Sequence, residues 1–182
     1  MKRLILLVAL VAPLACQHAS IAPHDDAESE AAVVQRDVRA MNDALFSGDA
    51  DVLVQHTLPA VVKKWGGPEA YSKIYMAVAK TQAKAGIKLE SFTFPSPPEF
   101  IAGQGERRFA LVPTRIIVTD GTNRGGSTGF QLGVKEPGAA EWKYIPGFFV
   151  RPDLLAELAP DFPVDHPLPP RSTEKLPARK SP

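Results

Sequence analysis

Between residues 28 and 86 the apolar positions recur with helical spacing. The clearest stripe repeats every three or four residues and consists of Val34, Val38, Met41 and Leu45. This spacing predicts an amphipathic helix with one apolar face, which Ser47-Gly48 ends. Asp49 caps a short second helix that runs to about His56. Pro59 then opens a helical turn, and Pro68 starts a third helix that ends at Gly86.

From residue 87 the pattern changes to short segments rich in β-branched and aromatic residues, separated by proline and glycine. Five segments fit this description: 87–94, 100–102, 106–119, 127–135 and 142–150. Short connections between successive strands predict antiparallel hairpins. Helices followed by strands predict an α+β fold, in which N-terminal helices pack on a curved antiparallel sheet. A weak helical turn is expected over residues 153–159.

Both ends of the chain differ in composition from this middle part. Residues 1–15 contain two basic residues and then an apolar run, which is typical of a signal peptide and too short for a spanning helix of about 20 residues. Residues 16–26 are expected to form a polar spacer. From Pro160 the chain is rich in proline and polar residues, which bury too little apolar surface to offset the entropy of ordering. We therefore expect residues 161–182 to be a disordered tail and residues 27–160 to be one domain.

The signal ends Leu14-Ala15-Cys16, which resembles a bacterial lipoprotein signal. In that family a small residue precedes a cysteine that is acylated on its thiol and becomes the new N-terminus. The family prefers leucine three positions before the cysteine, where this chain has Pro13, and ordinary cleavage after Ala22 is the alternative. The single cysteine has no internal disulfide partner. The resemblance implies an exported protein of the periplasm or cell envelope, anchored to the membrane through lipid at Cys16.

Composition narrows the classes of partner. The full chain has a net charge of +1, with 45% hydrophobic and 23% charged residues. Such near neutrality argues against nucleic acid as a partner, and the hydrophobic share suits a globular domain. The four histidines have no metal-ligand spacing, so we expect neither a metal site nor a cofactor.

Two loose motifs resemble a known superfamily. Residues 58–67 read Leu-Pro-Ala-Val-Val-Lys-Lys-Trp-Gly-Gly, and residues 142–147 read Trp-Lys-Tyr-Ile-Pro-Gly. Together with the order of elements, they are similar to uncharacterised exported members of the nuclear transport factor 2-like and ketosteroid-isomerase-like superfamily, over about residues 28–160. The resemblance implies a cone-shaped, cystatin-like fold whose helices and curled sheet enclose a pocket. Isomerase-type members use an acidic base and a tyrosine or acid donor there.

Two tyrosines and a tryptophan are candidate ligand contacts in such a pocket. Tyr71 and Tyr75 share the predicted inner face of the third helix with Ile74 and Val78, and core packing is the alternative for both tyrosines. Trp142 begins a strand, where it either stacks on a ligand or covers the end of the core.

Arg115 is the fourth candidate contact, because it lies in a strand dominated by apolar residues. Strict alternation places it on the face of Phe109 and Leu111, but a bulge at Pro113 would reverse that assignment. An inward guanidinium would need an anionic partner or ligand, and a solvent-facing arginine is the alternative.

No residue pattern in the chain specifies a reaction. The apolar stripe of the first helix shows no acid or tyrosine, and most later acids fall where strands begin or turn, so no acid–base pair is predicted. We expect a non-catalytic envelope protein whose cone domain binds a small hydrophobic or anionic ligand, or another protein. The alternative is a small-substrate enzyme, isomerase- or hydratase-like, and a buried carboxylate beside a tyrosine or arginine in the pocket would favour it. A homodimer formed through the exposed sheet face is a third expectation.

Replacing Cys16 with serine should abolish lipid attachment, because the acyl group is carried by the thiol. Full-length wild type and Cys16→Ser are expressed in a bacterium supplied with labelled fatty acid. The wild type should incorporate the label and sediment with membranes, and the variant should do neither. An unlabelled wild type, or an unchanged membrane fraction for Cys16→Ser, would show that processing occurs elsewhere.

Overall fold

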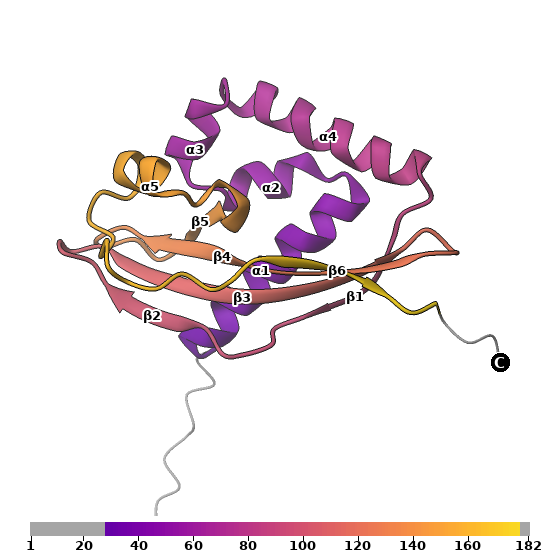
Figure 1. Ribbon diagram of the computed structural model, residues 1–182. Helices are drawn as coiled ribbons and strands as arrows, with labels where there is room; N and C mark the ends of the chain where they lie inside the picture. The colour runs from indigo at the N-terminus through magenta and orange to yellow at the C-terminus, as the bar shows by residue number, and fades with distance from the viewer. Residues whose placement is uncertain (1–27, 179–182) are drawn as a thin grey trace, which may run out of the picture.

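The computed structural model describes residues 28–178. Four helices come first: α1 (Glu30–Ser47), α2 (Ala50–His56), α3 (Pro59–Lys64) and α4 (Pro68–Lys84). Five strands follow: β1 (Lys88–Thr93), β2 (Glu99–Ala102), β3 (Arg108–Thr119), β4 (Arg124–Lys135) and β5 (Lys143–Pro146). A 3-10 turn η1 (Gly147–Phe149), α5 (Pro152–Leu158) and β6 (Ser172–Leu176) come last. The predicted α+β fold is confirmed: N-terminal helices pack against a six-stranded antiparallel sheet (Figure 1).

β3 and β4 form the centre of the sheet. Their register is continuous over 12 residues of each strand, from Arg108 opposite Lys135 to Thr119 opposite Arg124. β2 and β1 pair with the two halves of β3, while β5 and β6 pair with the two halves of β4. The register passes Pro113 without a shift, so strict alternation holds along β3. The irregularity lies instead in β1, between Leu89 and Ser91.

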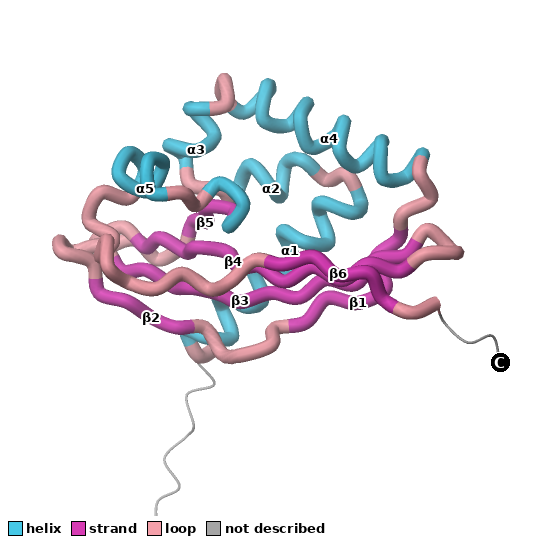
Figure 2. Tube along the Cα trace, viewed as in Figure 1, coloured by secondary structure: helices cyan, strands magenta, loops and turns pink. Residues whose placement is uncertain are grey.

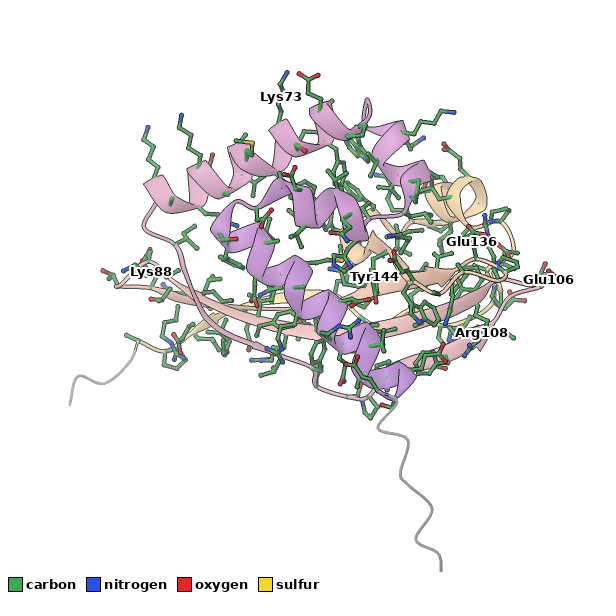
Figure 3. The ribbon with its side chains drawn as sticks, turned by 180° about the vertical axis from the view of Figure 1, so that it is seen from behind. Lys73, Lys88, Glu106, Arg108, Glu136 and Tyr144 are labelled. Atoms are coloured by element: carbon green, nitrogen blue, oxygen red, sulfur yellow. The ribbon has the colours of Figure 1, made fainter. Side chains whose placement is uncertain are left out.

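Helix α1 begins and ends at local signals. The Ser29 hydroxyl accepts a hydrogen bond from the backbone N–H of Ala32 at 3.2 Å, and Gly48 closes the helix with a left-handed φ of 80°. The predicted apolar stripe is mostly buried, and α1 crosses one face of the sheet diagonally (Figure 3). The predicted signal, Cys16, the spacer up to residue 26 and residues 179–182 lie outside the described residues.

Helix α4 packs on α1 and α2, so it buries a narrower stripe than the sequence predicts. Tyr71 and Tyr75 are buried as expected, but the side of the helix that carries Ile74 and Val78 is not covered: these residues are 43% and 39% exposed. No helix among residues 28–178 is both long and apolar enough to cross a membrane.

The C-terminal segment differs from the predicted disordered tail. Phe162 is 3% exposed, and its ring meets the edge of Phe109 with the centroids 5.2 Å apart. The backbone N–H of Gln104 donates to the carbonyl of Asp161 at 2.8 Å. Farther along, β6 pairs with β4, after a coil that Figure 2 shows between α5 and β6. A composition argument misses such docking, because one aromatic anchor and one strand ladder attach a proline-rich segment to an existing surface.

Replacing Phe162 with alanine should lower the free energy of unfolding by about 3–5 kcal/mol, as for other fully buried phenylalanines. The matched control is Val164→Ala, two residues away and 83% exposed, which should change it by less than about 0.5 kcal/mol. Urea unfolding of both variants provides the measurement. Equal stabilities would mean that residues 160–164 do not dock on β3.

Candidate functional site

Two hollows flank residues 139–143, which end the connection from β4 and begin β5. The apolar hollow, about 540 Å³, lies between α3, β4 and α5, and its apolar walls include Leu58, Pro59, Ala60, Val134 and Leu158. The polar hollow, about 350 Å³, lies between α1, the end of α2 and β5, and is lined by Arg36, Asp37, Gln55, His56 and Trp142 among others. Both hollows share Ala140, Glu141 and Lys143. Both volumes fall in the range of small-molecule sites.

Charged groups on the rim of the apolar hollow neutralise each other. Arg107 donates to Glu136 at 2.8 Å, and Lys143 donates to Glu141 at 2.7 Å. The Lys143 ammonium also donates to the carbonyl of Gln55 at 2.9 Å. The rim therefore presents little net charge to an entering ligand.

A buried carboxylate lines the polar hollow. Asp37 is 7% exposed although it lies in α1. The Tyr144 hydroxyl donates to its Oδ2 at 3.2 Å, and Arg36 donates to its Oδ1 from Nη2 at 2.9 Å. Burial raises the pKa of Tyr144, and the negative charge of Asp37 raises it further, so the phenol stays protonated. Figure 3 shows Tyr144 beside α1, which this pair links to β5.

His56, the last residue of α2, lies close to this pair. Its ring centroid is 6.4 Å from that of Tyr144. Burial lowers the pKa of His56; the charge of Asp37 opposes this shift, and that of Lys143 adds to it. The imidazole is therefore neutral at pH 7 and offers one donor and one acceptor nitrogen. Within residues 28–178 its ring nitrogens make no hydrogen bond, so His56 has free capacity for a ligand.

The structure brings only one of the four predicted contacts to these hollows. Trp142 lines the polar hollow but is 1% exposed, with the Arg108 guanidinium 5.9 Å and the Lys135 ammonium 5.5 Å from its ring. Tyr71 and Tyr75 lie in the core, where their hydroxyls are hydrogen-bonded to each other at 3.1 Å.

Arg115 lies away from both hollows. It has the face that strict alternation predicts, shared with Phe109 and Leu111, and its anionic partner is Glu174 of β6. Its side chain is 35% exposed. The sequence predicts an anionic partner only for an inward guanidinium; the observed partner comes from the segment predicted to be disordered.

Asp37 and Tyr144 are residues that sequence reasoning missed, whereas the place of His56 at the end of a helix explains it without a ligand. Asp37 follows Val34 by three positions and precedes Met41 by four, so it lies within the apolar stripe that was described without an acid. That spacing is the signal that would have found it. For Tyr144, alternation along β5 points to burial but cannot identify Asp37 as its partner, since the two lie 107 residues apart.

No cluster of three or more His, Cys, Asp or Glu side chains within residues 28–178 is arranged to hold a metal ion. No protein-family model, curated protein or solved structure matches the chain. The functional argument therefore depends on the geometry of the two hollows.

The pKa of His56 should lie below its ordinary value of 6.5. Because the unfolded chain then binds the proton more tightly, this residue's contribution to stability is present above about pH 6.5 and is lost as the pH falls below it, through the lowered pKa of the folded state. The free energy of unfolding of wild type should fall more steeply over this range than that of His56→Gln. NMR titration of the ring and urea unfolding measure the two quantities. A midpoint at or above 6.5 would contradict the expected burial.

Proposed function

We propose that the protein is an exported, lipid-anchored envelope protein that binds a small apolar ligand in the apolar hollow. One observation supports this: a hollow of about 540 Å³ whose walls come from separate parts of the chain. Leu58 precedes α3, Val134 lies in β4 and Leu158 ends α5. Since the core holds these residues, the hollow is preformed, and a ligand need not order it.

The chemistry of the walls favours a ligand with an apolar body. Leu58, Val134 and Leu158, which line the hollow, are 4%, 1% and 6% exposed. The charged residues of its lining are paired with one another. Binding would be driven by removal of apolar surface from water, at about 25 cal/mol per Å². Because the charged groups on the rim are paired with each other, none is free to bind a charged ligand. We therefore favour a neutral ligand over an anionic one.

We also infer that the domain belongs to the nuclear transport factor 2-like superfamily. The supporting features are the order of elements, the antiparallel sheet and the position of α1 across one of its faces (Figures 1 and 3). The proposed envelope location depends on the signal that ends Leu14-Ala15-Cys16. A homodimer through the sheet face stays a prediction.

A small-substrate enzyme is the second candidate, and the Asp37–Tyr144 pair beside His56 favours it. Asp37 is the buried carboxylate beside a tyrosine that the enzyme hypothesis requires. An acid–base reaction needs such groups within reach of a substrate proton. However, both oxygens of Asp37 accept hydrogen bonds already, and Tyr144 is 0% exposed. The pair thus joins α1 to β5, and we rank ligand binding first.

Filling the apolar hollow should abolish binding of the neutral dye Nile red. Ala60 lies on its exposed rim, so Ala60→Trp should place an indole in the hollow and weaken binding at least about tenfold. The control is Ala156→Trp, an exposed helical alanine that does not line either hollow. Nile red fluorescence is titrated with each protein, and unfolding midpoints verify the folds. No saturable binding to wild type, or equal loss in both variants, would overturn the proposal.

A further inference from the structure

Strand β6 lies at the edge of the sheet as a nearly separate segment. It pairs antiparallel with the first half of β4, from Arg124 opposite Leu176 to Thr128 opposite Ser172. Four of its five residues are exposed, and none belongs to the hydrophobic core. The chain that leads to it from α5 has no helix or strand and contains Pro160, Pro163, Pro167, Pro169 and Pro170.

Side chains of β3 and β4 contact particular groups of β6. The Arg115 guanidinium donates to the Glu174 carboxylate. The hydroxyls of Thr128 and Ser172 are 2.6 Å apart. Beyond the strand, Arg124 donates from Nη1 to the carbonyl oxygen of Pro177 at 3.0 Å.

Gly126 makes the contact with Glu174 possible. A Cβ at this position would lie 2.8 Å from Oε1 of Glu174 and 3.0 Å from its Cγ. Glu174 is opposite Gly126 in the ladder, whereas Arg115 belongs to the next strand, β3. The missing side chain thus lets the glutamate lie across β4 and reach the arginine.

We propose that the edge of β4 from Arg124 to Thr128 is a recognition site for an extended segment of a partner protein that carries a glutamate at the position of Glu174. β6 is its tethered occupant, and the partner's strand displaces it. The partner carries serine or threonine and, two residues later, glutamate, which is the spacing of Ser172 and Glu174. In such strand addition the backbone ladder supplies affinity and the side-chain contacts supply selectivity.

Two features distinguish this site from a strand that merely covers an edge. A cover needs backbone pairing and no selective side-chain contact, whereas Arg115 and Gly126 together fit a glutamate. The tether also favours replacement of β6: it is a proline-rich chain without helix or strand, and none of the five residues of β6 belongs to the hydrophobic core. Because a short tether holds the strand at millimolar effective concentration, a partner binds only when it competes with that concentration.

The test uses the full chain with β6 disabled and a fluorescent peptide of residues 169–178. The double variant Thr173→Pro/Glu174→Pro disables β6. In an antiparallel ladder the backbone N–H of one of any two adjacent residues donates to the neighbouring strand, and proline has no N–H to donate. Fluorescence anisotropy should show that the peptide binds this variant at least about tenfold more tightly than it binds wild type. A peptide with Glu174→Gln should bind about fivefold more weakly, as for a partly exposed ion pair. Adding Arg115→Glu to the disabled chain should reverse the preference, in favour of a peptide with Glu174→Arg.

Three results would overturn the proposal. The peptide does not bind the disabled chain although its unfolding midpoint shows that it is folded. The glutamate and glutamine peptides bind equally, so Arg115 does not select. Wild type forms dimers by exchange of β6 in size-exclusion chromatography with light scattering, so the occupant is a second copy of this chain rather than a partner.

Discussion

The continuous pairing of β3 with β4 is the constraint on which the rest of the structure depends. Every other strand pairs with one of these two, so their register decides which side chains meet. Gly133 of β4 is one such position: a Cβ there would lie 3.1 Å from the Trp142 ring and 3.3 Å from the Tyr144 ring. The glycine thus lets the Trp142 and Tyr144 rings approach β4 closely. Tyr144 can then reach Asp37, and the polar hollow forms beside the pair.

The same edge holds the start of α1. Glu30 accepts from Arg108 at 2.5 Å and 2.9 Å and from Lys135 at 3.3 Å, and both cations lie over the Trp142 ring. The hydrogen bonds from Arg108 lower the pKa of Glu30, which keeps the carboxylate charged. Two turns later Asp37 makes the second contact. Helix α1 is thus fixed to the sheet at two points on one side, and it supplies one wall of the polar hollow, while loop residues 140–142 supply part of another.

The elements set by local patterns could be predicted, and those set by a distant partner could not. The stripe of α1 and the hairpin strands follow from spacing and from glycine and proline positions. The burial of Asp37 could not be predicted, because a charged residue within an apolar stripe is buried only when it has a partner. That partner, Tyr144, is 107 residues away in the sequence. Strand β6 could not be predicted for the same reason, since its partner strand is distant in the sequence. Ser-Thr-Glu-Lys-Leu has no apolar alternation, and its order comes from the β4 ladder and from Arg115.

The shared wall makes the two hollows physically dependent on each other. Lys143 lines both, and its charge contributes to the lowered pKa of His56, while Glu141 on the same wall has the opposite effect. A ligand in the apolar hollow that moved the Lys143 ammonium away from Glu141 would change the balance of charge at His56. Occupancy of one hollow would then alter the proton affinity of the other. The link between the two hollows is therefore electrostatic and passes through Lys143 and Glu141, whose charges have opposite effects on the pKa of His56.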